Sequence, residues 1–110
     1  MSIASIDRKI FELITKLIYD TARNRIIWSG GIVNGTGEFH AEYDNFYRLV
    51  FYVEFTRVMS YKLSLFDRNG TYFPVIVNIN SLSDLYDAIL KQTGFGSKMY
   101  AAIEHILNLK

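Results

Sequence analysis

"FYRLVFYVEFTRV", residues 46–58, carries the strongest secondary-structure signal in this chain. Large apolar residues recur there at every second position, which is the spacing of a β-strand with one buried face. One set of alternate positions is apolar throughout (Leu49, Phe51, Val53 and Phe55), and the other is mixed (Arg48, Val50, Tyr52, Glu54 and Thr56). The stretch therefore predicts a strand with its first set in the core and its second set on the opposite face of a sheet.

The segments on either side of this strand alternate in the same way. Before it, apolar and polar residues take turns (Phe39, Ala41 and Tyr43 against Glu38, His40 and Glu42). After it, "SYKLSLFD" (60–67) and "TYFPVIVNI" (71–79) are typical of two strands joined by a tight turn. Because short turns join antiparallel neighbours, the pattern predicts an antiparallel meander of four to five strands.

The register of the last hairpin follows from its apolar residues. We expect a three-residue loop over 68–70, because this loop sets Leu65 opposite Phe73. Two residues further along each strand, it sets Leu63 opposite Val75, so that the large apolar side chains share one face. The proline in the second strand has no amide hydrogen, which predicts that this strand lies at an edge of the sheet or carries a bulge.

Helical spacing appears on both sides of the meander. Over residues 3–18, isoleucine and leucine recur every three or four positions, which predicts an N-terminal helix with one buried face. We expect Asn24 to end this helix in a left-handed conformation, and "RIIW", residues 25–28, to form a short strand. Near the C-terminus, the same spacing predicts one helix over 82–93 and another from Ser97.

Together these elements predict an α+β fold. It has an N-terminal helix, the meander, and two C-terminal helices packed on one face of the sheet. The composition agrees with a single domain over residues 1–110, because half of the residues are hydrophobic and only one is proline.

The glycine-rich stretch "WSGGIVNGTGEF", residues 28–39, raises the question of a phosphate-binding loop. Such a loop needs a following helix and usually a lysine, whereas an alternating segment follows here without one. We therefore expect a flexible connection between two strands, with residues 29–37 mobile. The Asn-Gly pairs at 34–35 and 69–70 predict turns.

Charge and cysteine content exclude several classes of function. The 12 basic and 11 acidic residues give a net charge of +1, so we expect neither a nucleic-acid nor a membrane partner. Charged residues interrupt the N-terminal apolar segment, which argues against a signal peptide or a membrane-spanning helix. The absence of cysteine excludes disulfides and thiolate metal sites. We expect a cytoplasmic protein with no cofactor.

Glu38, His40 and Glu42 are the residues that come nearest to a catalytic pattern. On a strand their side chains point the same way, as metal ligands would have to. Their spacing of about 6.8 Å along the strand is too wide for three of them to converge easily on one ion. We therefore expect a solvated face, and a small metal-dependent or hydrolytic enzyme using these residues is the alternative hypothesis.

The outer face of the sheet is the more informative feature. It carries apolar and aromatic residues where a solvated face would be more polar (Val50, Tyr52, Phe66, Tyr72 and Ile76). Such a patch often marks a protein interface, so we expect a homodimer or another protein partner to contact these residues. The other interpretation is that a helix or the glycine-rich stretch folds over them.

The order of landmarks resembles that of small uncharacterised bacterial and mobile-element proteins. The resemblance lies in the opening helix, "RIIW", the meander with "YKLSLFDRNGTY", and the helix "LSDLYDAILKQ". It implies a small accessory protein that acts by binding, as immunity and anti-defence proteins do. Our first hypothesis is therefore a non-catalytic protein-binding module.

Overall fold

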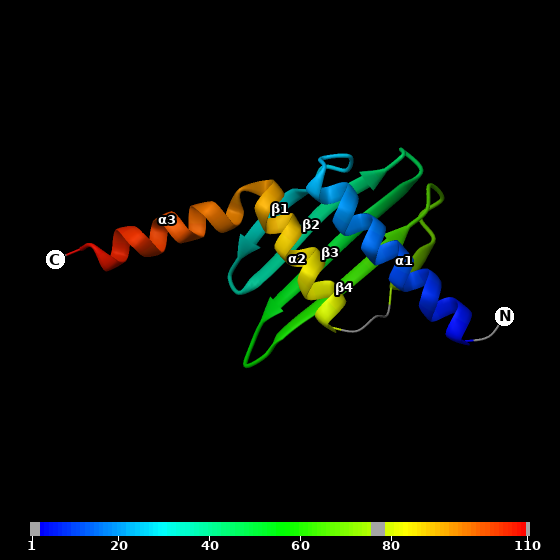
Figure 1. Cartoon of the computed structure of the whole chain (residues 1–110), viewed down its shortest axis with the longest axis horizontal. Helices are drawn as coiled ribbons and strands as arrows, with labels where there is room; N and C mark the ends of the chain where they lie inside the picture. The colour runs from blue at the N-terminus through cyan, green and yellow to red at the C-terminus, as the bar shows by residue number, and fades with distance from the viewer. Residues whose placement is uncertain (1–2, 76–78, 110) are drawn as a thin grey trace.

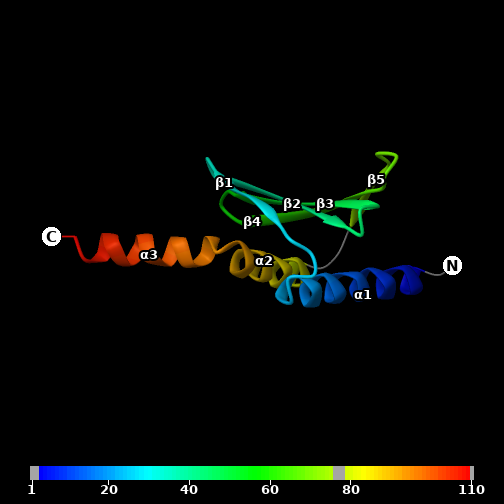
Figure 2. The same cartoon turned by 90° about the horizontal axis from the view of Figure 1, so that it is seen from above.

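The computed structural model describes residues 3–75 and 79–109, and they form a layer of helices against an antiparallel sheet (Figure 1). In chain order the elements are α1 (Ile3–Ala22), β1 (Ser29–Val33), β2 (Thr36–Tyr43), β3 (Tyr47–Phe55), β4 (Met59–Phe66), β5 (Tyr72–Val75), α2 (Ile79–Thr93) and α3 (Phe95–Leu107). The predicted α+β layout is confirmed. Of the two C-terminal helices, α2 packs on the sheet and α3 runs out past its edge (Figure 2).

The sheet is a meander in the order β1-β2-β3-β4-β5, with every neighbouring pair antiparallel. Its last hairpin has the predicted register, because Leu65 pairs with Phe73 and Leu63 with Val75. Gly70 has a φ of 82° in the connecting loop. β5, which contains the proline, lies at the edge, where a missing amide hydrogen costs least.

The core lies between one face of the sheet and the pair α1 and α2, which lie side by side (Figure 2). Leu49, Phe51 and Val53 of the predicted inner set are fully buried. The ring of Tyr86 from α2 stacks on that of Phe51, with the ring centroids 5.8 Å apart. Phe73 lies on the same face but is 44% exposed, because its strand is at the edge, away from the middle of the helix layer.

The segment between α1 and the sheet corrects one prediction. Asn24 has the expected left-handed conformation, with a φ of 58°. Residues 25–28, however, form no strand, and the sheet begins only at Ser29. The apolar character of this segment instead serves the core, since Ile26 and Trp28 are buried. The indole Nε1 of Trp28 donates a hydrogen bond to Thr21 Oγ1 at 3.0 Å.

The glycine-rich stretch is part of the sheet, so the predicted connection over 29–37 is wrong for most of its length. Only Asn34 and Gly35 connect the strands, in a two-residue turn with φ values of 52° and 79°. The turn predicted at 34–35 is therefore confirmed, whereas the mobility of the stretch stays a prediction. Glycine allows close contacts here: a Cβ at Gly30 would collide with the Glu38 carbonyl oxygen, and one at Gly37 would lie 2.6 Å from a methyl of Val53.

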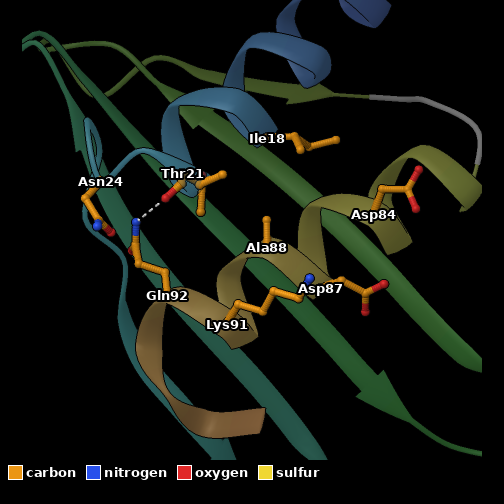
Figure 3. A pocket seen from close by; sticks show the side chains of 9 residues that line it. Ile18, Thr21, Asn24, Asp84, Asp87, Ala88, Lys91 and Gln92 are labelled. Carbon is orange, nitrogen blue, oxygen red and sulfur yellow. Dashed lines mark hydrogen bonds between the residues drawn. The ribbon is translucent and has the colours of Figure 1, made fainter. Parts of the chain in front are cut away.

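Gln92, near the end of α2, ties that helix to the segment between α1 and β1. Its amide nitrogen donates to the carbonyl oxygen of Thr21 at 2.9 Å (Figure 3) and to that of Ile26 at 2.7 Å. Its amide oxygen accepts a hydrogen bond from the Trp28 backbone nitrogen at 2.7 Å. These three bonds fix the end of α2, and with it the point from which α3 departs.

The described part of the chain is elongated because of α3. Its radius of gyration is 15.5 Å, whereas about 13 Å is usual for a compact domain of this length. Among the helices that the structure describes, none is long and apolar enough to cross a membrane.

Candidate functional site

The outer face of the sheet holds four of the five residues predicted to form an interface, namely Val50, Tyr52, Phe66 and Tyr72. Ile76, the fifth, lies outside the described residues. No helix in the described part of the chain covers this face (Figure 2).

The strand register mixes charges into this outer face. Tyr52 is paired with Glu38 on one side and with Lys62 on the other. The guanidinium of Arg48 lies 4.7 Å from the ring centroid of Phe66. The outer face therefore carries both charged and aromatic side chains, with the aromatic ones in small clusters. The interface predicted there stays a prediction.

Glu38, His40 and Glu42 point to this same face from β2. His40 Nε2 lies 3.6 Å from Glu38 Oε1. Glu42 is the cross-strand neighbour of Arg48. Within residues 3–75 and 79–109, no three histidine, aspartate or glutamate side chains gather in a way that could hold a metal ion.

Asp20 is a buried carboxylate that the sequence analysis did not single out. Tyr43 donates a hydrogen bond to its Oδ2 at 2.6 Å, and Lys16 Nζ lies 3.1 Å from the same oxygen. The hydrogen bond from Tyr43, followed by the interactions with Lys16, holds the pKa of Asp20 below its usual 3.8. The sequence held a signal, because Asp20 follows Leu17 on the apolar stripe of α1 at helical spacing. The cluster joins α1 to β2 and is structural.

The base of α3 is well anchored. Gly94 ends α2 with a φ of 71° and redirects the chain, and its carbonyl oxygen accepts a hydrogen bond from the Lys98 backbone nitrogen at 3.0 Å. The ring of Phe95 reaches back to β1, where it lies 3.7 Å from the position of a Cβ on Gly31. α3 thus leaves the body in a direction set by contacts at its first turn.

Beyond this first turn, α3 exposes nearly all of its apolar side chains, and none of its residues is buried. Five large ones on the helix are between 47% and 72% exposed: Met99, Tyr100, Ile103, Ile106 and Leu107. With Ala102 among them, they occupy about half of the helix circumference at 100° per residue. Leu109, two residues past the end of the helix, is 63% exposed and extends this apolar surface. We call these seven residues the arm face. A stripe this wide is typical of a helix that packs against a protein surface.

Two shallow hollows run along the outer side of α2. One, of about 480 Å³, lies between α1 and α2 and is lined by Ile18, Thr21, Ala22, Asn24, Asp84, Asp87, Ala88, Lys91 and Gln92 (Figure 3). The other, of about 460 Å³, lies where α2 meets α3 and is lined by Asp87, Leu90, Lys91, Gly96, Ser97 and Tyr100. We call the second one the elbow groove. Tyr100 lines the elbow groove and also belongs to the arm face, so the groove and the arm face adjoin each other.

No family model, curated protein or solved structure matches the chain. The arm face is a feature of the described surface that folding of the single chain leaves unexplained.

Proposed function

We propose that this chain is a non-catalytic protein-binding module that acts through the arm face of α3. The observation that carries the proposal is the exposure of six large apolar side chains, five on a helix with no buried residue and one just past its end. Taking roughly 200 Å² for a fully exposed large side chain, the six expose about 700 Å². The largest apolar patch on an ordinary monomer is about 300–600 Å² and is often functional.

The electrostatics of α3 support a protein partner. The charged side chains within its helical span, Lys98, Glu104 and His105, lie outside the arm face. An apolar stripe without charges within it, bordered by polar residues, is the usual anatomy of a protein interface. A partner that covers the arm face gains roughly 25 cal/mol for each Å² of apolar surface removed from water.

Site-specific photo-cross-linking in the native host tests this proposal. A photoreactive phenylalanine derivative replaces Ile106 in one variant and its neighbour His105 in the control, so that the probe lies on the arm face in one case and about 100° around the helix, outside that face, in the other. We expect a discrete protein adduct from position 106 and a much weaker one from position 105. Absence of any protein adduct from positions 99, 103 and 106 in folded protein would contradict the proposal.

A further inference from the structure

We propose that the partner of the arm face is a second copy of this chain, bound so that two α3 helices pair antiparallel about a two-fold axis near Ile103. This inference rests on the proposed function and names its partner. A two-fold axis makes the contact self-complementary, because the same surface patch is used by both copies.

The exposed area matches what such a dimer needs. A stable interface buries about 800 Å² on each partner. The arm face supplies about 700 Å² of this from its six large side chains, at roughly 200 Å² for each fully exposed one. The net charge of +1 places little repulsion between two copies.

Ile103 lies near the middle of the arm face, both along the helix and around it at 100° per residue. Met99, Ile103 and Ile106 follow each other at four- and three-residue spacing, which brings them onto one line of the helix. Paired helices come within about 8–10 Å of each other, and the distance is set by the side chains at the crossing point. With the axis at Ile103, the large side chains of this line from one copy pack between those of the other.

The elbow groove favours the antiparallel orientation. In an antiparallel pair, the carboxyl end of each α3 lies beside the start of the other. Leu107 and Leu109 of one copy then lie near the elbow groove of the other, where Leu90 and Tyr100 offer apolar contact. A parallel pair would leave both elbow grooves empty, and it would align the two helix dipoles unfavourably.

The first part of the test is the molar mass in solution, measured by gel filtration with light scattering. We expect the purified chain at tens of micromolar to show twice the 12.7 kDa of one copy. Ile106→Glu should weaken the dimer by at least about tenfold, since it places a charge at the centre of a buried contact. His105→Glu, one residue away on the polar side, should leave the dimer intact. Both positions are exposed in the single chain, so both variants should fold, as circular dichroism would verify.

The second part is disulfide cross-linking. Because the chain has no cysteine of its own, every disulfide must come from the introduced residues. A disulfide requires Cα atoms about 4.4–6.8 Å apart. We expect Ile103→Cys to cross-link to itself, and a mixture of Met99→Cys with Ile106→Cys to cross-link between the two variants. Ile106→Cys alone should not cross-link to itself, because antiparallel pairing about residue 103 separates the two copies of residue 106 by about 9 Å along the axis.

The outcomes separate this inference from the proposed function. A mass of one chain at every concentration overturns the inference. If position 106 nevertheless cross-links to a different protein in cells, the proposed function still stands. A dimer in which Ile106→Cys cross-links to itself overturns the antiparallel arrangement, and a dimer that Ile106→Glu leaves unchanged overturns the choice of the arm face.

Discussion

Asp20 illustrates how single residues hold this structure together. Its carboxylate is almost wholly buried, and it joins α1 to β2 through Tyr43. Its Oδ1 is buried with no hydrogen bond from the residues that the structure describes, and the Arg25 guanidinium lies 4.0 Å from it. A buried carboxylate stabilises a fold only while its partners are in place. The cluster should therefore affect stability in a way that depends on pH.

Asp20→Asn should destabilise the protein by about 1–3 kcal/mol at neutral pH, because the Tyr43 and Lys16 contacts lose their charged partner. The folded-state pKa of Asp20 lies below 3.8, so its ionised form stabilises the fold above that value. The stabilisation is lost as the pH falls through the lowered pKa. Urea denaturation between pH 7 and pH 2.5 should therefore show the difference between the two proteins shrinking below about pH 4. A difference that is constant across this range would contradict the assignment.

Two glycines allow a matched test of close packing in the sheet. Gly30 and Gly70 both have a positive φ, of 132° and 82°. A Cβ at Gly30 would also strike the Glu38 carbonyl oxygen, whereas one at Gly70 would meet nothing within 4 Å. Gly70→Ala should therefore cost only the left-handed strain of about 1–2 kcal/mol. Gly30→Ala should cost distinctly more in chemical denaturation, and equal losses would show that β1 is not held against β2 as described.

At the scale of the elements, the meander could be predicted from sequence because one pattern fixes both its strands and its register. Leu49, Phe51 and Val53 define the inner face, and only one pairing of the last hairpin keeps Leu65 and Leu63 on that face. A slip of one residue would expose the whole set.

β1 could not be found in this way. It is "SGGIV", a five-residue strand in which glycine takes two places, so neither alternation nor β-propensity marks it. Trp28 and Ile26 made the preceding segment look like the strand instead. Their burial comes from contacts with the helix layer, and local sequence does not show such contacts.

The exposure of α3 also escaped sequence analysis. Helical periodicity identifies an apolar face but not what covers it. The fully buried residues of the inner sheet face, such as Phe39 and Phe51, already lie beneath the layer formed by α1 and α2. The tie between Gln92 and the segment before β1 then fixes the end of α2, and α3 continues beyond the sheet.

Gln92→Ala should loosen the junction between α2 and the segment before β1. It removes three hydrogen bonds to backbone groups of Thr21, Ile26 and Trp28. Leaving these partly buried groups unpaired should cost about 2–4 kcal/mol. Hydrogen exchange of the Trp28 amide should become much faster than in the unaltered chain, with Leu63 in the middle of the sheet as the internal reference. An unchanged exchange rate at Trp28 would show that Gln92 does not hold this junction.

The geometry of β2 also bears on the hypothesis that Glu38, His40 and Glu42 bind a metal ion. The α-carbons of residues two apart on a strand lie about 6.8 Å from each other. His40 and Glu38 approach within 3.6 Å, but Glu42 has Arg48 as its cross-strand neighbour, and no three such groups gather in the described part of the chain. We therefore expect zinc, manganese and magnesium at micromolar concentration to leave the melting temperature unchanged. A stabilisation by one of these metals that His40→Ala abolishes would support the enzyme hypothesis instead.

At the scale of the whole molecule, the structure separates a compact helix-and-sheet body from a projecting helix. The body has the buried core, and the longest extent of the described chain, 61 Å against 30 Å and 23 Å, comes from α3 (Figure 1). An apolar helix held away from its own core loses the packing that stabilises most helices in proteins. In the proposed dimer a second copy provides that packing, so we expect α3 to be stable as part of the dimer.

Solvent exposure of Ile106 in the purified protein tests this claim most directly. The probe is a soluble paramagnetic agent, which broadens the NMR signals of exposed methyl groups. Ile106 is 65% exposed in the single chain, and Val58, at 74%, is the matched reference on the loop between β3 and β4. At 200 µM protein we expect the agent to broaden the Val58 methyl signals strongly and to spare those of Ile106, because the partner copy covers them. Equal broadening at both residues would show that α3 is bare in solution and would contradict the dimer.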